Sequence, residues 1–215
     1  MEAFMKKILI ILLLAVICFP AIAQEINLGA SFDVYSSVYM YQGYYGFIYD
    51  ETLNFSSTIS LGYLHRFAGE ALKVGLGVSA WIPRSASSGY MPRDSSRQLS
   101  FSDVAGYATI QLYPLRFAKI QNLAANLYAK ANLGYHHPIL FDEWADEYLY
   151  SAWGGFHYGA GIGFDFPKWV FLELLYNGYY WGADIWNVSE LDNAEFENFA
   201  VTLGFKFAFG KNRKY

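Results

Sequence analysis

Three histidines, two serines and an aspartate are the residues of this chain whose chemistry could support hydrolysis. A serine hydroxyl becomes a nucleophile when a histidine takes its proton and an acid orients that histidine. The candidate groups are Asp94, Ser95, Ser96, His136, His137 and His157. Their spacing matches no catalytic arrangement, and His157 has no serine two residues further along. We therefore predict no catalytic site and interpret His136 and His157 as polar groups that fill space.

Two groups of carboxylates could instead hold a metal ion. One group is Asp142, Glu143, Asp146 and Glu147, and the other is Asp184, Glu190, Asp192, Glu195 and Glu197. Carboxylates at this density can bind Ca²⁺ or Mg²⁺, but neither group has the spacing of an EF-hand loop. A solvated acidic surface is the favoured interpretation. The sequence predicts no metal site and no cofactor.

The first 23 residues have the pattern of a secretory signal peptide. Lys6 and Lys7 give it a positive start, residues 8–17 form an apolar core, and residues 21–23 form a small-x-small cleavage site. The apolar run is too short for a membrane-spanning helix, which needs about 20 residues. We predict that residues 1–23 are removed.

The remaining residues, 24–215, are predicted to form one domain without cysteine. Cys18 could alternatively accept a lipid, but Ile17 is bulkier than the residue expected before such a cysteine. A net charge of −4 gives no support for nucleic-acid binding. Charged residues make up only 16 % of the chain, whereas a soluble surface carries about 25–35 %. No other apolar stretch is long enough to span a membrane as a helix, so a membrane location would require strands.

Apolar and polar residues alternate in eight segments, which is the pattern of strands with one face of each kind. The segments are Ile26–Tyr41, Leu53–Phe67, Leu72–Ile82, Ser102–Tyr113, Leu123–His136, Gly155–Phe166, Val170–Tyr176 and Asn198–Phe209. Short turns follow the second, fourth and sixth segments, and longer loops follow the other four. Long loops at one end and short turns at the other predict an all-β, eight-stranded, antiparallel up-and-down transmembrane barrel.

The apolar face of these strands is predicted to contact lipid. The other face is rich in Gly, Ser, Asn and Tyr and would make a poor soluble exterior. The interior of an eight-stranded barrel is only wide enough for side chains to fill it, and the apolar side chains are too large and too many for that space. A soluble calyx with the opposite orientation is the alternative.

The charged residues of the strands support this orientation because they lie on the polar face. We predict a charge network in the lumen, made of Asp33, Lys73, Asp103, Lys130, Glu173 and Lys206. Arg66 and Asp165 share that face, and Lys206 is expected to pair with Glu173 or Asp33. Four large side chains, Tyr35, Tyr107, Tyr128 and Phe171, are expected to point inward against glycines such as Gly163. The lumen should therefore be filled.

The chain resembles the small outer-membrane β-barrel family of the OmpX and OmpA-transmembrane type over its whole mature length. Its last strand is similar to the signal that the barrel-assembly machinery reads, with Thr202, Gly204, Phe207 and Phe209 at the matching positions. In most members the aromatic residue is terminal, whereas residues 210–215 follow it here. The resemblance implies a monomer in the bacterial outer membrane, in contact with lipid and lipopolysaccharide, with both termini in the periplasm.

Aromatic residues on the long loops indicate a binding surface. Those singled out are Tyr44, Tyr45, Trp144, Tyr180, Trp181 and Trp186. Some of these residues could instead belong to the aromatic girdle at the membrane surface. The function predicted from the sequence is non-enzymatic, in binding or envelope structure. The alternatives are a narrow channel for small or apolar solutes and, by family resemblance, an enzyme that modifies lipid A.

Overall fold

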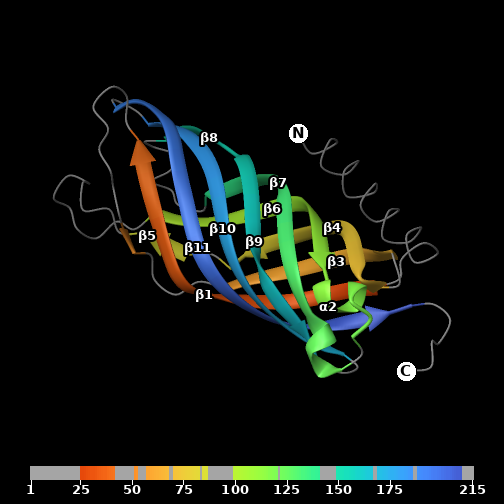
Figure 1. Ribbon diagram of the computed structural model, residues 1–215. Helices are drawn as coiled ribbons and strands as arrows, with labels where there is room; N and C mark the ends of the chain where they lie inside the picture. Colours follow the sequence, from red (N-terminus) through yellow and green to blue (C-terminus); the bar gives the residue numbers. More distant parts are fainter. Residues whose placement is uncertain are drawn as a thin grey trace.

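The computed structural model describes residues 25–41, 51–52, 57–67, 70–82, 84–86, 99–120, 122–140, 149–166, 169–185 and 188–209. Eight long strands form a closed antiparallel barrel (Figure 1). They are β1 (Glu25–Tyr41), β3 (Ser57–Phe67), β4 (Leu72–Trp81), β6 (Leu99–Leu112), β7 (Leu127–Leu140), β9 (Gly155–Asp165), β10 (Val170–Ile185) and β11 (Val188–Ala208). Each strand pairs with its neighbours along the chain, and β1 pairs with β11 to close the barrel. The predicted architecture is confirmed, while the predicted signal peptide lies outside the described residues.

The start of β1 and the finish of β11 lie at the same end of the barrel, where the connections between strands are short. We call this end the turn side. Its longest connection contains α2 (Pro114–Phe117) and η3 (Leu123–Asn126). The sequence pattern assigned residues 123–126 to a strand, which is wrong. The Asn122 side chain accepts a hydrogen bond from the Ala124 amide at 3.1 Å and starts a 3-10 turn instead. Among the described residues, no helix is long and apolar enough to cross a membrane.

The opposite end, which we call the loop side, carries three short strands and an extension of the sheet. The short strands are β2 (Glu51–Thr52), β5 (Arg84–Ala86) and β8 (Leu149–Trp153). β10 and β11 continue as a hairpin until Ile185 pairs with Val188, so the long loop predicted between residues 176 and 198 is wrong. β8 pairs with this part of β10, and the last residues of β1 pair with β11. We call this part of the sheet, which is formed by β8 and the loop-side ends of β1, β10 and β11, the loop-side extension.

Glycines weakened the strand pattern in the loop-side extension. Gly178 and Gly182 interrupt the alternation of β10, but the ring of Tyr158 lies against Gly178 and the ring of Trp153 lies against Gly182. An aromatic side chain from a neighbouring strand supplies the packing that the glycine lacks. The hairpin is therefore regular although its own sequence does not alternate clearly.

The outer surface of the barrel is an apolar band with aromatic residues at both edges. Leu76, Ile162 and Leu203 are each more than half exposed within the band. Trp169 and Phe207 lie outward near the turn side, and Tyr135 and Tyr180 lie outward near the loop side. Aromatic girdles around an apolar band are typical of barrels in an outer membrane. The outward face that the sequence predicted is the one observed.

One expected inward residue points outward. A β-bulge between Asp33 and Tyr35 inserts Val34 as an extra residue, so the faces of β1 exchange beyond it. Tyr35 is 47 % exposed, whereas Ser36 is buried. The prediction that Tyr35 fills the lumen is therefore wrong. Tyr107, Tyr128 and Phe171 do point inward.

Candidate functional site

Glu173 is the centre of the polar packing in the turn-side half of the lumen. It lies on β10 with only 1 % of its surface exposed. Lys130 on β7 donates to both of its carboxylate oxygens at 3.0 and 2.8 Å. The hydroxyl of Tyr128 donates to it at 2.8 Å, and the amide of Gln111 at 3.5 Å. Glu173 thus joins β6, β7 and β10 through hydrogen bonds from three side chains.

Two further carboxylates complete the ion pairs at this end. Glu25 pairs with Lys73 at 2.8 Å and with Arg66 at 2.8 Å. Asp165 pairs with Lys206 at 3.1 Å and with Lys73 at 3.4 Å. The hydroxyl of Tyr113 donates to Asp165 at 2.8 Å. We call the resulting set the turn-side charge network; its members are Glu25, Arg66, Lys73, Lys130, Asp165, Glu173 and Lys206.

The structure divides the six predicted lumen charges between the two ends of the barrel. Lys73, Lys130, Glu173 and Lys206 belong to the turn-side charge network. Lys206 contacts Asp165 rather than Glu173 or Asp33. The two remaining charges lie on the loop side, where Asp33 accepts from Asn198 at 2.7 Å and Asp103 contacts His136.

Glu25 is a member of the network that the sequence prediction did not include. It is 1 % exposed and bridges Lys73 and Arg66. The predicted strand started one residue later, at Ile26, so Glu25 was not assigned to a face. Its alternation with Asn27 was the signal that could have placed it in the lumen.

The loop-side half of the lumen is closed by rings, which we call the aromatic cluster: Trp81, His136, His157, Tyr179 and Phe196. All five are at most 5 % exposed. Tyr179 is at the centre, with ring centroids 4.7 Å from Trp81, 4.5 Å from His157 and 5.3 Å from His136. Trp81 also contacts Phe196 at 4.8 Å. These rings come from five different strands and pack against one another across the loop-side half of the lumen.

His136 is hydrogen-bonded through both ring nitrogens. Nδ1 lies 2.5 Å from Asp103, and Nε2 lies 2.6 Å from the backbone oxygen of Tyr180. A carbonyl oxygen can only accept, so Nε2 must carry a proton. Both nitrogens are thus occupied, and His136 has no free position from which to act on a substrate.

The structure also places the other residues singled out in the sequence. In the expected assembly signal, Thr202 lies in the lumen 2.7 Å from Ser31, Gly204 lies against Phe171, and Phe207 and Phe209 are exposed on the outside. Tyr180 and Trp181 lie in β10, and Tyr180 faces outward. Tyr44, Tyr45, Trp144 and Trp186 lie outside the described residues, as do Asp94, Ser95, Ser96 and residues 142–147.

Aromatic rings packed on glycines fill the lumen between its polar groups, and this gives a first prediction. The Tyr128 ring lies against Gly163 of the paired strand, so a methyl group there would displace Tyr128 and its bond to Glu173. Gly163→Ala should lower the free energy of unfolding by about 1–3 kcal/mol, as overpacking does. Urea unfolding in lipid vesicles measures this.

The matched control is Gly106→Ala, because nothing lies within 4 Å of a methyl group added at Gly106. Its effect should stay within about 0.5 kcal/mol. Equal effects of the two substitutions would show that the ring of Tyr128 is not packed as described.

Comparisons with known proteins show likeness of fold only. No protein-family model matches the sequence, and no curated protein matches it either. Among solved structures, Ail, the attachment invasion locus protein of Yersinia pestis, is 14 % identical, with a TM-score of 0.49 over 86 % of this chain and 99 % of that chain. Neisserial surface protein A is 16 % identical, with a TM-score of 0.49 over 85 % and 96 % of the two chains. OprG from Pseudomonas aeruginosa is 14 % identical, with a TM-score of 0.45 over 87 % and 97 %.

The geometry of the chain itself identifies its class. Its barrel is closed, its outer surface is an apolar band between aromatic girdles, and its interior is polar and filled. Only a closed barrel satisfies all backbone hydrogen bonds of strands placed in lipid. The chain has the fold of a small, integral eight-stranded outer-membrane β-barrel.

Proposed function

We propose that this protein is a monomeric, non-enzymatic outer-membrane barrel that acts through its loop-side surface, in binding or in envelope structure. The observation that carries the proposal is the closure of the lumen at two levels. The turn-side charge network fills one half, and the aromatic cluster fills the other. A lumen occupied by these described side chains favours the outer surface as the place where a partner binds.

The loop-side extension offers such a surface. Its paired strands continue beyond the apolar band. In this part of β11, Glu195 and Glu197 lie on the outward face. The hydroxyls of Tyr180 and Tyr176 are directed to these two carboxylates. In this proposal the extension faces the cell exterior beside lipopolysaccharide, and both termini lie in the periplasm. Thr202, Gly204, Phe207 and Phe209 would be read by the barrel-assembly machinery during insertion.

The proposal is tested by shortening the loop-side extension without opening the barrel. Residues 183–192 are replaced by an Asn-Gly turn, because Trp181 and Ala194 are paired just below the cut. We expect the shortened protein to insert normally but to lose the partners that full-length protein captures from intact envelopes. A lumen variant, Tyr107→Phe, serves as the control and should keep them. A shortened barrel that captures the same partners would exclude the extension as the binding surface.

The channel alternative makes a different prediction in planar bilayers. Because the described lumen is filled at both levels, we expect the purified protein to show no steady ion conductance. Trp81→Ala combined with Phe196→Ala removes two rings of the aromatic cluster and serves as a variant in which leakage should rise. Steady currents in the unmodified protein that scale with salt and vanish when Lys130 or Glu173 is replaced would establish a pore.

A further inference from the structure

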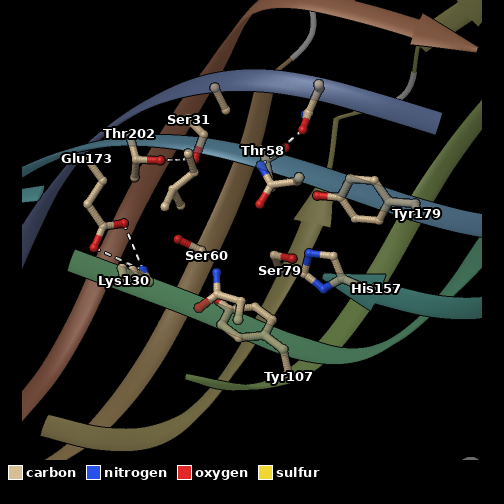
Figure 2. A pocket seen from close by; sticks show the side chains of 15 residues that line it. Ser31, Thr58, Ser60, Ser79, Tyr107, Lys130, His157, Glu173, Tyr179 and Thr202 are labelled. Carbon is tan, nitrogen blue, oxygen red and sulfur yellow. Dashed lines mark hydrogen bonds and ion pairs between the residues drawn. The ribbon is translucent and has the colours of Figure 1, made fainter. Parts of the chain in front are cut away.

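A small polar cavity lies in the middle of the lumen, between the turn-side charge network and the aromatic cluster (Figure 2). Hydroxyl, amide and imidazole groups surround it, among them those of Ser60, Ser79, Tyr107, His157 and Tyr179. The space available to the centres of water molecules is about 40 Å³. One water needs roughly 10–15 Å³ of such space, so about three would fit.

Two side chains that line this cavity have buried polar atoms without partners. His157 is 2 % exposed, and within the described part of the chain neither of its ring nitrogens is hydrogen-bonded. Asn177 also lines the cavity, but no hydrogen bond of normal geometry joins it to His157. The side-chain oxygen of Asn132, which is 7 % exposed, also has no partner among the described residues. Native proteins rarely leave such groups unsatisfied.

The plane of the His157 ring is held by two aromatic neighbours. It is stacked on Tyr179 with an interplanar angle of 1° and meets Tyr107 edge to face, with centroids 5.6 Å apart. Any hydrogen-bond partner of its nitrogens must therefore lie near this plane. A neutral imidazole offers one donor and one acceptor, which is what a bridging water can satisfy on both sides.

Other occupants fit this cavity poorly. Its volume excludes solutes much larger than a few waters, and its polar lining would leave an apolar molecule without favourable contacts. The nearest full charges are those of Lys130 and Glu173, which neutralise each other at 2.8 Å. The cavity therefore offers a bare ion no uncompensated opposite charge.

We propose that this cavity is a binding site for an ordered cluster of about three water molecules, which bridges His157, Asn132 and the surrounding hydroxyls. Members of the aromatic cluster border it toward the loop side, and Lys130 and Glu173 of the charge network border it toward the turn side. It completes the hydrogen bonding of the lumen without making the lumen a pore.

Magnetic resonance of the full-length barrel, folded in detergent micelles, tests this directly. The chain has four histidines, so His157 can be assigned by comparing the unmodified protein with single histidine variants. We expect the ring protons of His157 and the side-chain amide of Asn132 to show cross-peaks to long-lived bound water. Absence of these cross-peaks in the folded, unmodified protein would overturn the proposal, whatever the variants do.

Urea unfolding gives a second test with opposite signs for the two outcomes. His157→Phe keeps a ring against Tyr107 and Tyr179 but removes both nitrogens. If water fills the cavity, this variant loses hydrogen bonds to it. Its unfolding midpoint should then fall below that of the control His137→Phe, whose side chain lies on the outer face of the barrel. If the cavity is empty, the variant sheds two unpaired groups and its midpoint rises, which would contradict the proposal.

Discussion

Glu173→Gln should lower the free energy of unfolding by about 3–5 kcal/mol, the usual cost of leaving a buried charge without its partner. The substitution keeps the size of the side chain but removes the charge that faces Lys130 at 2.8 Å. Lys130 is only 11 % exposed, so water cannot replace the carboxylate. The new amide group would also face the donors of Tyr128 and Gln111, which need an acceptor.

The double variant Glu173→Gln, Lys130→Met separates the charge from the packing. It removes the unpaired cation, so it should recover a substantial part of the stability lost in the single variant. Urea unfolding in lipid vesicles measures all the variants in one assay. If Glu173→Gln is as stable as the unmodified protein, the ion pair at the centre of the turn-side charge network does not hold the lumen together.

Which residues belong to that network was largely predictable from the sequence, because this depends only on whether a side chain lies on the inward or the outward face of its strand. Side chains alternate across a strand, so a charge between two apolar residues must point away from them. This places Lys73, Lys130, Glu173 and Lys206 in the lumen without further information. The choice of partners was not predictable in the same way. Lys206 on β11 meets Asp165 on β9 across the intervening β10. That contact depends on the tilt and stagger of the barrel, which sequence alternation does not report.

The features that the sequence prediction missed arise where a local change alters the alternation. The bulge at Val34 exchanges the faces of β1, so Tyr35 points outward. No residue type near Val34 marks this insertion, because the pairing with β11 creates it. The aromatic cluster was missed for a related reason. Tyr179 and Phe196 lie in a segment that looked like a loop, although the observed strands place both rings in the lumen.

A lysine at the middle of the apolar band should cost far more than a lysine at its edge. On β11, Phe207 and Phe199 lie at the two edges and Leu203 lies midway, 54 % exposed. At a rise of about 3.3 Å per residue and a tilt of about 40°, the eight steps between the edges span roughly 20 Å of membrane. Leu203→Lys should lower the free energy of unfolding by about 2–4 kcal/mol, and Phe207→Lys by about 0–1 kcal/mol.

The same strand supplies an inward-facing control for this gradient. Lys206→Ser should have a small effect, because Asp165 keeps Lys73 and Tyr113 as partners. Folding yield and urea unfolding in vesicles of defined thickness would rank the three variants. Thinner bilayers should reduce the cost of Phe207→Lys before that of Leu203→Lys, since the edge of the band leaves the hydrocarbon first. A cost at Phe207 that equals or exceeds the cost at Leu203 would mean that the apolar band is centred elsewhere on β11.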